Sequence, residues 1–524
     1  MSVNHRMPMP LPALGRRALL QGAAAAGGAL LLPRGARAAE TPRRGGTLRV
    51  SMTYNPAALD PMTGRNAPDF NTLLAIYEGL IDLDPATLRP KPGLAKAFSW
   101  KDPTTLVLDL QPGVTFHDGS AFDADAVKFN LDRYRSDPRS NVKPDCSSID
   151  AVEAVGKDQV VLRLNRPNSS LPTILADRPG LMASPTAIKN APGGNIDRAP
   201  IGTGPFKFVS WQDNDRIVLT RNDSYWRTGL PYLDGLVLRI IGEQPTGLRS
   251  VVAGENDMAI NIDVHLKTVA DRAGNLVARL APSMFFWGAY INFAKPPLDN
   301  LKVRQALSWG IDREAMNKAI ALGLNTPGNG VITKEHWACD PATFNYYGYD
   351  PDKARKLLAE AGHPDGIDVP MLGWSDQTAM QRQEVAMAQL AKAGIRVQLT
   401  PASPQDSSIQ FFGPQKKGSA RMSGMGGYAD PSQQYDNLLA KSAYYNAGGI
   451  ELPGYRALID ATQATDDLNE RKAAFAKLQR FVIENALVLT FLFQTNLLVT
   501  QKTVQGVTVD LTNKPRFHSA WLSA

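Results

Sequence analysis

The stretch that decides the fold reads Ala199-Pro200-Ile201-Gly202-Thr203-Gly204-Pro205-Phe206-Lys207-Phe208, where two prolines and two glycines lead into an alternating segment that ends at Trp211. The prolines fix φ, and we expect the glycines to adopt backbone angles that are closed to other residues. This pattern predicts a shaped turn that feeds a strand. We expect the chain to re-enter here a domain that it left earlier, and an ordinary surface turn is the alternative.

The size of the chain predicts more than one domain. A single hydrophobic core does not grow to 524 residues, so we expect two or three domains. The contents of 43% hydrophobic and 20% charged residues are those of a globular, soluble protein. The 38 prolines and 43 glycines predict many turns and short strands rather than a helical bundle.

The first 38 residues have the features of an export signal. Arg16-Arg17 precedes an apolar run from Ala18 to Leu32, and Ala36-Arg37-Ala38 has the small-x-small form of a signal peptidase site. The paired arginines favour the twin-arginine route, with general secretion as the alternative. A membrane anchor is disfavoured because the run is short and rich in alanine and glycine. We therefore expect a periplasmic protein that is cleaved near Ala38.

The positive charge of the chain belongs mainly to this leader. The whole sequence has a net charge of +7, and the leader contributes five arginines and no acidic residue, which leaves +2 for the remainder. A nucleic-acid-binding protein is expected to show a basic stripe with interleaved aromatic residues, and we find none. We expect no nucleic-acid partner.

The sequence contains two cysteines, Cys146 and Cys339. An exported chain reaches an oxidising compartment, so the two thiols could pair. Sequence does not establish that they lie close together, and the question stays open.

The first part of the chain predicts a strand, a loop and a small α+β lobe. The strand covers 47–53 and runs into a loop with Tyr54 and Asn55. Loops that leave strand ends often carry binding groups, so we expect this loop to line a pocket. The patterns that follow predict the elements of the lobe, which are a helix from Asp69, a strand over 106–110, a helix over 123–134 and a hairpin over 152–164.

The second half predicts an α/β lobe, because helices lead repeatedly into strands. Helices are expected to begin at Asp299 or Asn300 and at Asp350, and a helix over 377–393 leads into a strand over 395–399.

The end of the chain combines a glycine-rich run with a last helix. The run 411–431 predicts a close approach of its backbone to a strand or to a ligand. A long helix is expected over 466–485, followed by two separate strand-like segments over 487–493 and 497–500.

No short motif of catalysis or cofactor binding occurs in the sequence. We find no Gly-x-Ser-x-Gly elbow, His-Glu-x-x-His pair, Cys-x-x-Cys pair or Gly-x-x-x-x-Gly-Lys-Ser/Thr loop. The histidines outside the leader stand singly, which favours structural or surface roles over metal ligation: His117, His265, His336, His363 and His518. We therefore expect a binding protein that is not an enzyme and needs no cofactor or metal, with an exported hydrolase as the alternative.

Seven groups of residues follow one another along the chain. They are Leu59-Asp60-Pro61; Tyr77-Glu78-Gly79-Leu80; Gly113 to Gly119 with Asp125-Ala126-Val127; Pro200 to Phe206; Asn222-Asp223-x-Tyr225-Trp226; Val303 to Leu307 with Ile311-Asp312-Arg313; and Lys353-Ala354-x-x-Leu357-Leu358-x-x-Ala361-Gly362. In this order they resemble family 5 extracytoplasmic solute-binding proteins, the dipeptide, oligopeptide and nickel class that serves ABC transporters.

This resemblance implies an α/β fold of the type II periplasmic binding protein kind, with an additional α+β domain. Domain I would be discontinuous, over 39–75, 199–290 and 495–524, while domain II would fill 76–198 and domain III 291–494. A small-molecule solute would be enclosed between domains I and III by hinge closure and delivered to permease subunits in the inner membrane. We expect a monomer.

The resemblance places the choice of solute in residues 423–431. In peptide-binding relatives this run resembles Gly-Trp-x-x-Asp-x-x-Asp-Pro, whose first Asp takes the α-ammonium group of the peptide. Here Gly424 stands at the tryptophan position and Gly427 at the ammonium-binding position, while Asp430-Pro431 is kept. A buried ammonium group needs a fixed counter-charge, and two glycines leave room. The departure favours a modified peptide, an opine, a glycoside or an aromatic compound over an ordinary di- or oligopeptide, for which Asp69 or Asp430 would be the substitute acid.

Ligand-binding residues are expected in two places. Tyr54, Asn55, Arg65 and Asn66 lie in the N-terminal loop that lines the cleft in relatives. In the second half, Trp374 offers a stacking face, with a packing role as the alternative, and Arg382 is a candidate for a carboxylate, with a solvated helix face as the alternative. The run around Gly427 supplies Ser423, Gly424, Met425, Gly427, Tyr428 and Asp430.

Overall fold

The computed structural model describes residues 41–64 and 67–524. The predicted export signal and its cleavage site lie outside the described residues, and so do Arg65 and Asn66. All the elements named below belong to one compact unit, Arg43–Ala524.

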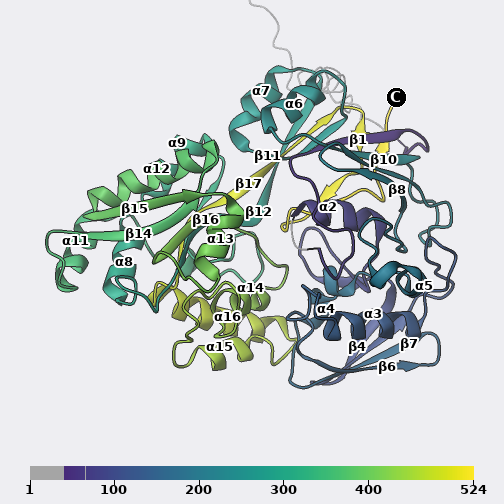
Figure 1. Ribbon diagram of the computed structural model, residues 1–524, viewed down its shortest axis with the longest axis horizontal. Helices are drawn as coiled ribbons and strands as arrows, with labels where there is room; N and C mark the ends of the chain where they lie inside the picture. Colours follow the sequence, from purple (N-terminus) through teal and green to yellow (C-terminus); the bar gives the residue numbers. More distant parts are fainter. Residues whose placement is uncertain (1–40, 65–66) are drawn as a thin grey trace, which may run out of the picture. The chain divides into compact units, whose positions relative to one another are not determined.

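An 11-stranded mixed sheet forms the framework of this unit (Figure 1). One part, which we call the β1 half, has β1 parallel to both β10 and β11. The other part, the β14 half, has β14 parallel to both β15 and β16. The strands of the β1 half are β1 (Thr47–Met52), β8 (Phe206–Gln212), β9 (Arg216–Arg221), β10 (Gly235–Ile240) and β11 (Met258–Ile262), and those of the β14 half are β14 (Ile367–Trp374), β15 (Ile395–Ala402) and β16 (Ala420–Met425).

Two long antiparallel strands, β12 (Leu276–Ile291) and β17 (Val488–Gln501), connect the two halves. The last part of β17 pairs with β11, whereas the last part of β12 pairs with β16. The register of the pair shifts between Pro282 and Phe286, at the passage from one half to the other. β17 is continuous where two segments were expected, because the polar residues Thr495 and Asn496 are buried inside the strand and interrupt only its apolar pattern.

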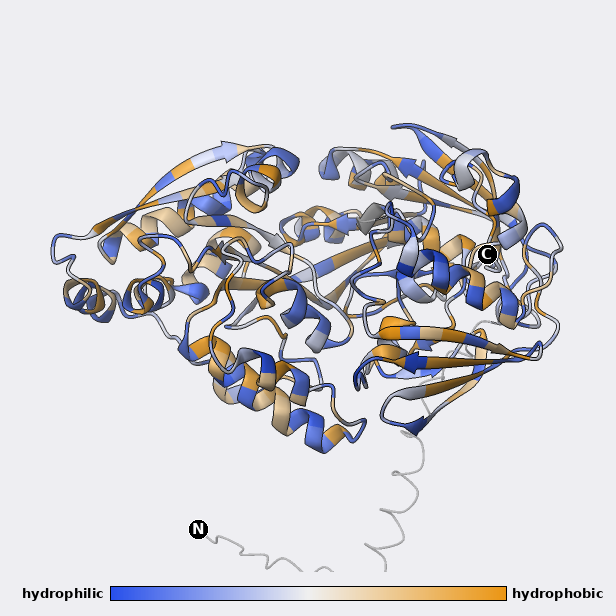
Figure 2. Ribbon diagram, turned by 60° about the horizontal axis from the view of Figure 1, so that its bottom comes forward, coloured by the Kyte–Doolittle hydropathy of each residue, from blue (hydrophilic) through white to orange (hydrophobic). Residues whose placement is uncertain are grey.

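Helices pack on both halves of the sheet. In the β1 half, α6 contacts β1 and β11, and α2 contacts β8; in the β14 half, α12 and α13 both contact β14 and β15. Figure 2 shows hydrophilic and hydrophobic residues side by side on these helices, as expected of helices with one buried face. The bounds are α2 (Ala67–Ile76), α6 (Gln244–Val252), α7 (Lys267–Arg272), α8 (Leu301–Trp309), α9 (Arg313–Ala321), α10 (Pro341–Phe344), α11 (Pro351–Glu360), α12 (Gln377–Lys392), α13 (Pro404–Phe412), α14 (Pro431–Leu439), α15 (Tyr455–Ala461) and α16 (Leu468–Glu484).

A second sheet forms the expected α+β lobe, which we call the four-stranded lobe. Its antiparallel order is β4-β5-β7-β6, and α3 contacts β6 and β7. The bounds are β4 (Ala95–Asp102), β5 (Thr105–Leu110), α3 (Ala124–Ser136), β6 (Ile149–Val155), β7 (Gln159–Leu164), α4 (Leu171–Ile174) and α5 (Pro185–Asn190). Short pieces complete the fold: β2 (Ile81–Leu83), β3 (Pro90–Pro92), β13 (Thr326–Pro327), β18 (Val504–Gln505), β19 (Thr508–Val509), β20 (Pro515–Arg516), β21 (Trp521–Leu522), and the 3-10 turns η1 (Arg178–Gly180), η2 (Pro192–Gly194) and η3 (Val264–Leu266).

Buried apolar side chains form three large clusters that follow the sequence. The largest lies within 286–493, the second lies mainly within 62–182, and the third combines 48–77, 181–260 and 498–520. These stretches resemble those of the three expected domains. The division into three domains with the stated boundaries remains a prediction.

The segment 199–208 is held by close backbone contacts rather than by unusual backbone angles. Neither Gly202 nor Gly204 has a positive φ, so the expected reason for these glycines is wrong. A Cβ at either position would overlap the Ile76 carbonyl at the end of α2. The Gly204 N–H donates to the Ile76 carbonyl at 2.9 Å, and the His117 N–H of the four-stranded lobe donates to the Gly202 carbonyl at 2.8 Å. The glycines allow the chain to pass this close on its way into β8, as expected of a re-entry segment.

Most of the expected helix starts are confirmed. Asp123, Asn300 and Asp350 cap α3, α8 and α11, and in each case the side chain accepts a hydrogen bond from a first-turn N–H. The expected hairpin over 152–164 is the β6–β7 pair. Three central strands had no strong sequence pattern and were not expected: β11, β12, and β16 inside the glycine-rich run.

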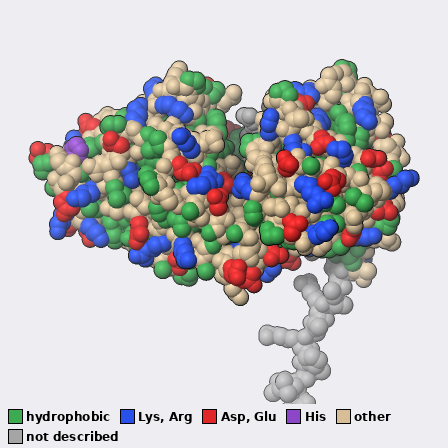
Figure 3. All heavy atoms as spheres, turned by 90° about the horizontal axis from the view of Figure 1, so that it is seen from below, with side chains coloured by type: hydrophobic (Ala, Val, Ile, Leu, Met, Phe, Trp, Pro, Cys, Tyr) green, Lys and Arg blue, Asp and Glu red, His purple; other side chains and the backbone are tan. Residues whose placement is uncertain are grey.

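Cys146 is buried and Cys339 is partly buried, and both are free thiols. Within 41–64 and 67–524, no helix is long and apolar enough to cross a membrane. The same residues contain no group of three or more His, Cys, Asp or Glu side chains that could hold a metal ion. Figure 3 shows basic and acidic side chains interspersed over the face that it draws.

Candidate functional site

The carboxyl ends of strands from both halves point at the middle of β12. β11 and β12 are both antiparallel to β17, so they run in the same direction, whereas β16 runs against β12. Ile262 at the end of β11 and Leu280 of β12 both pair with Leu497 of β17, so β11 ends at the level of Leu280. At the other end, β16 ends at Met425, which pairs with Phe286 of β12. The short stretch of β12 between these two levels therefore lies where both sets of strand ends meet. In open α/β sheets, ligands bind outside the carboxyl ends of the strands, at such a change of strand order.

The loops at these strand ends carry the polar and aromatic groups of the site. In the β1 half, Tyr54 follows β1, Glu243 follows β10 and Asp263 follows β11. In the β14 half, Trp374 ends β14 and Tyr428 follows β16. The site is thus built from residues that are distant in sequence and brought together by parallel strands.

Two side chains of β12 fill the space beside the glycines of the β16 loop. A Cβ at Gly424 would overlap the ring of Phe285, and a Cβ at Gly427 would overlap Cβ of Met284. The expectation that these glycines leave room for a ligand is therefore wrong at the Cβ positions themselves. β12 therefore supplies an aromatic ring beside Gly424, and its Met284 occupies the space that a side chain at position 427 would need.

Asp430 is engaged inside the β14 half. Its side chain caps α14 by accepting from the Ser432 N–H, and both its oxygens lie within 2.9 Å of Arg471 Nη2. Both side chains are almost completely buried. The carboxylate is thus already paired, which leaves it little capacity to take an ammonium group from a solute. Asp69, the other proposed substitute acid, is buried and accepts from the Ala57 N–H at 2.7 Å.

Arg382 of α12, which is partly buried, forms an ion pair with the buried Asp263 of the β1 half. The same guanidinium lies 4.6 Å from the ring centre of Trp287. Burial lowers the pKa of Arg382, while the opposite charge of Asp263 acts to raise it. This pair therefore joins the two halves at the strand ends, and Arg382 has a protein carboxylate as its partner.

Arg421 of β16 is buried among aromatic rings and neutral oxygens. It donates to Ser407 Oγ at 3.1 Å, to Ser423 Oγ at 3.0 Å and to the Pro404 carbonyl at 3.1 Å. Its guanidinium lies 5.5 to 6.0 Å from the ring centres of Phe412, Trp374 and Tyr290. Burial lowers its pKa, and no carboxylate among the described residues forms an ion pair with it.

Tyr428 lies where the β14 half meets the four-stranded lobe. Burial raises the pKa of its hydroxyl, with smaller effects from Tyr445 and from Asp145 and Arg178 of that lobe. Asp145 accepts from Gln433 Nε2 of α14 at 2.6 Å, and burial raises the pKa of this carboxyl group. Arg178 and Lys514 both lie over the ring of Phe70, at 5.3 and 4.1 Å from its centre.

Tyr54 and Asn55, the two predicted binding residues of the N-terminal loop that the structure describes, differ in their exposure to a solute. Tyr54 is 63% exposed, and burial of its hydroxyl, followed by the charges of Asp376 and Glu243, raises its pKa. The Asn55 side chain instead accepts from Trp211 Nε1 at 3.0 Å and donates to Asp213 at 3.0 Å. Its amide is used inside the β1 half, whereas Tyr54 is accessible.

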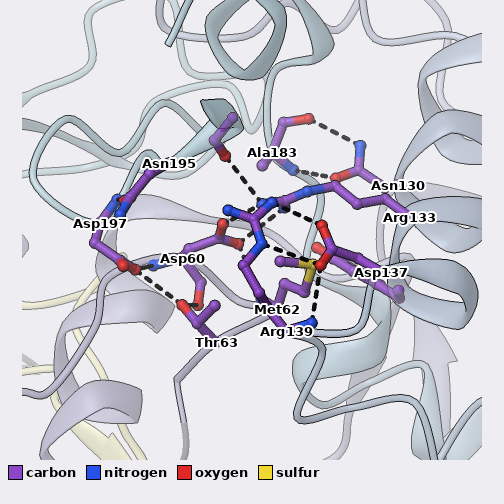
Figure 4. Close-up of polar contacts among 12 residues, drawn as sticks. Asp60, Met62, Thr63, Asn130, Arg133, Asp137, Arg139, Ala183, Asn195 and Asp197 are labelled. Carbon is purple, nitrogen blue, oxygen red and sulfur yellow. Dashed lines mark hydrogen bonds and ion pairs between the residues drawn. The ribbon is translucent and has the colours of Figure 1, made fainter. Parts of the chain in front are cut away.

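A buried ion pair fixes the continuation of this loop (Figure 4). Both oxygens of Asp60 accept from the guanidinium of Arg133 on α3. The Asp60 N–H and the Thr63 hydroxyl both donate to Asp197, at 3.2 and 2.9 Å. The Leu59-Asp60-Pro61 motif therefore ties the loop after β1 to the four-stranded lobe.

Comparison with known proteins identifies the family. The family described as bacterial extracellular solute-binding proteins, family 5 middle, matches residues 89–447. The chain belongs to this family. Family 5 proteins are periplasmic solute-binding proteins of ABC transporters and are not enzymes, which sets aside the exported hydrolase. The predicted family and fold class are therefore confirmed.

Curated relatives and solved structures agree with this assignment. The glutathione-binding protein GsiB of Escherichia coli K12 is 31% identical over 416 residues, covering 76% of this chain and 80% of the relative. GsiB of Pectobacterium atrosepticum is 34% identical over 365 residues, covering 67% of this chain and 68% of the relative. DppA of Helicobacter pylori with peptide STSA superposes with a TM-score of 0.81 at 23% identity, covering 92% and 99% of the two chains. AgaA of A. tumefaciens R10 with agropinic acid gives 0.80 at 24% identity, covering 91% and 99%.

Sequence reasoning missed several groups of the site. Phe285 and Met284 lie in a strand without a recognisable pattern, and Arg421 was hidden inside the glycine-rich run. Asp145 and Asp263 reach the site only through the fold. An arginine inside an apolar strand is the one signal that the sequence offered, since a buried strand position disfavours a charge.

Proposed function

We propose that the protein captures a solute at the strand ends between the β1 half and the β14 half and delivers it to permease subunits of an ABC transporter in the inner membrane. The convergence of strand ends on the middle of β12 carries this proposal. β12 and β17 connect the two halves at this point, so bending of the pair changes the access to the site. The proposed working form is a periplasmic monomer.

Three contacts support hinge closure. They join parts on opposite sides of the proposed site and do not involve residues of the connecting strands β12 and β17. Arg382 pairs with Asp263, and Gln433 donates to Asp145 at 2.6 Å. Arg166, just after β7 of the four-stranded lobe, donates to Oε1 of Gln463, just after α15, at 2.7 Å. Opening about β12 and β17 would break such contacts, so they contribute to the stability of a closed form only. A solute that bridges the halves would add to them and shift the population toward closure.

The solute that the site favours does not depend on a free α-ammonium group. Gly427 stands at the ammonium-binding position, Met284 excludes a side chain there, and Asp430 is paired with Arg471. The candidates remain a modified peptide, an opine, a glycoside or an aromatic compound. The ligands of two similar proteins, glutathione for GsiB and agropinic acid for AgaA, support a family site that is not restricted to ordinary peptides.

Calorimetry with matched peptide pools tests this assignment. We expect an N-acetylated pool to bind as tightly as the free-amine pool, because position 427 has no acidic side chain that could pair with the ammonium group. A double variant, Met284→Gly with Gly427→Asp, provides an acid with space for it and is expected to shift the preference toward the free amine. Met284→Gly alone is the matched control. Binding by the wild-type protein that requires the free amine would contradict the assignment and favour an ordinary peptide.

A further inference from the structure

Three buried hydrogen-bond donors lie together in the β14 half next to the strand ends: the indole N–H groups of Trp287 and Trp374, and the guanidinium of Arg421. None of them has an anionic partner among the described residues. Buried polar groups in folded proteins are nearly always hydrogen-bonded, so each exception calls for an explanation. Two unpaired indole N–H groups, beside an arginine that lacks a counter-charge, point to a shared cause.

Trp287 is the more deeply buried of the two indoles. It is 7% exposed, and its Nε1 has no hydrogen-bond partner within the described part of the chain. It follows directly on the register shift of β12, so it stands at the edge of the strand-end site. The face of its ring is covered by Arg382, which leaves the N–H edge to be satisfied.

Trp374 ends β14, and its position is fixed by its backbone. The Gln383 side chain of α12 accepts from the Trp374 N–H at 3.0 Å and donates to the Trp374 carbonyl at 2.8 Å. The ring meets that of Trp287 edge to face, with centres 5.0 Å apart. Trp374 Nε1 is also buried and lacks a partner among the residues described. Two unpaired donors thus belong to touching rings that are rigidly held.

Arg421 adds a positive charge beside Trp374. Its Cζ lies 5.9 Å from the Trp374 ring centre, and Ser407, Ser423 and Pro404 provide it with neutral acceptors only. A guanidinium carries five N–H groups in a planar fork that matches an oxyanion. Three of these N–H groups are accounted for by those contacts. The remaining donors and the unbalanced charge favour an acceptor with a negative charge.

We propose that Trp287, Trp374 and Arg421 form a donor-only subsite that binds an oxyanion of the solute, such as a carboxylate. The proposal rests on solute capture at this site and adds the chemistry of one end of the solute. These three groups only donate hydrogen bonds, so an ammonium group has no acceptor among them, whereas a carboxylate, sulfonate or phosphonate is a suitable acceptor for such donors. Trp374 acts here through its N–H rather than as a stacking face.

Calorimetry with two N-acetylated tripeptide pools tests the subsite. The pools differ only at the C-terminus, which is a carboxylate in one and an amide in the other. We expect the acid pool to bind at least tenfold more tightly to the wild-type protein, and Arg421→Gln to abolish this difference. Trp287→Phe and Trp374→Phe remove one N–H each while keeping a ring, and we expect each to weaken acid binding about five- to tenfold.

Trp226 provides the matched control. Its Nε1 is also buried and without a partner among the described residues, and Arg227 lies over its ring at 4.6 Å, but it packs against the four-stranded lobe. Trp226→Phe should leave binding of both pools unchanged. Equal binding of acid and amide pools, or the same loss with Trp226→Phe as with Trp374→Phe, would overturn the subsite while leaving solute capture intact.

Further arms separate the failure of the subsite from the failure of solute capture. Once the acid pool has bound more tightly than the amide pool, pools that end in a sulfonate or a phosphonate identify which oxyanion is preferred. If none of the pools binds, capture of a peptide-like solute is wrong, and the copurified solute tests the subsite instead. The solute that copurifies with the protein, identified by native mass spectrometry, must carry an oxyanion; a neutral or purely cationic solute would overturn the subsite alone.

Discussion

Two buried arginines of the β14 half, Arg471 and Arg421, have opposite surroundings: one is paired with a carboxylate and the other is not. Arg471 of α16 has both oxygens of Asp430 within 2.9 Å and also donates to the Thr462 carbonyl. Arg421, at the strand ends, has three neutral oxygens and aromatic rings, and no carboxylate among the described residues. A buried charge is costly unless it is paired. We therefore expect Arg471 to contribute to the stability of the fold, and Arg421 to bind an oxyanion of the solute.

We expect the largest loss of stability when the ion pair between Asp430 and Arg471 is removed. Asp430→Asn leaves Arg471 buried without a counter-charge, so we expect the free energy of unfolding to fall by about 3–5 kcal/mol. Urea denaturation followed by circular dichroism measures this. Glu484→Gln, which removes an exposed pair with Arg480, is the control and should change stability by less than about 1 kcal/mol. A loss for Asp430→Asn as small as that of the control would show that the pair does not stabilise the fold.

A pH titration tests the surroundings of the same pair. His336 accepts from the Ala338 N–H and contacts the Ala429 carbonyl, and burial lowers its pKa to about 4. Because its folded pKa lies below the ordinary value of 6.5, the unfolded chain binds the proton more readily between these values. Stability is therefore complete above pH 6.5 and falls as the pH drops toward 4, by about 3 kcal/mol for this group.

The control for this titration is a variant without the histidine. His117 has its pKa lowered to about 4 as well, again by burial, so it adds to the slope of the wild-type protein. His336→Gln should remove only its own part of the pH dependence between 6.5 and 4. An unchanged slope in this variant would mean that burial does not lower the pKa of His336 in the folded state.

The unpaired site should respond least in the absence of a solute. Arg421→Met removes a buried charge without a counter-charge and three hydrogen bonds to neutral oxygens. These effects oppose each other, so we expect the free energy of unfolding to stay within about 1 kcal/mol of the wild type. The same urea experiment measures it. A loss of 3 kcal/mol or more would place Arg421 with Arg471 as a structural residue.

Much of the fold could be predicted from the sequence because its local patterns agree with its tertiary structure. Caps such as Asp123 and Asp350, and the alternation in β8 and β15, are local, and they define the helices and strands that carry them. The central strands were harder. The last part of β12 and most of β16 are buried on both faces, so their apolar residues do not alternate, and Gly424 in β16 serves close packing rather than a turn.

The site was predictable only in part, for a physical reason. The glycine-rich run drew attention to residues 423–431, but their meaning depends on what lies opposite. Gly424 and Gly427 face Phe285 and Met284, and Asp430 faces Arg471. These contacts join residues far apart along the chain, so no local pattern reveals them. The placement of Tyr54 in the site stays a prediction.

A crystal structure of the protein with its copurified solute tests the central claim most directly. We predict density for a solute that spans the two halves over the middle of β12, with an oxyanion within hydrogen-bond distance of Trp374 Nε1 and the Arg421 guanidinium. A solute whose ammonium group is held at the β16 loop, with no acceptor near Arg421, would contradict the account.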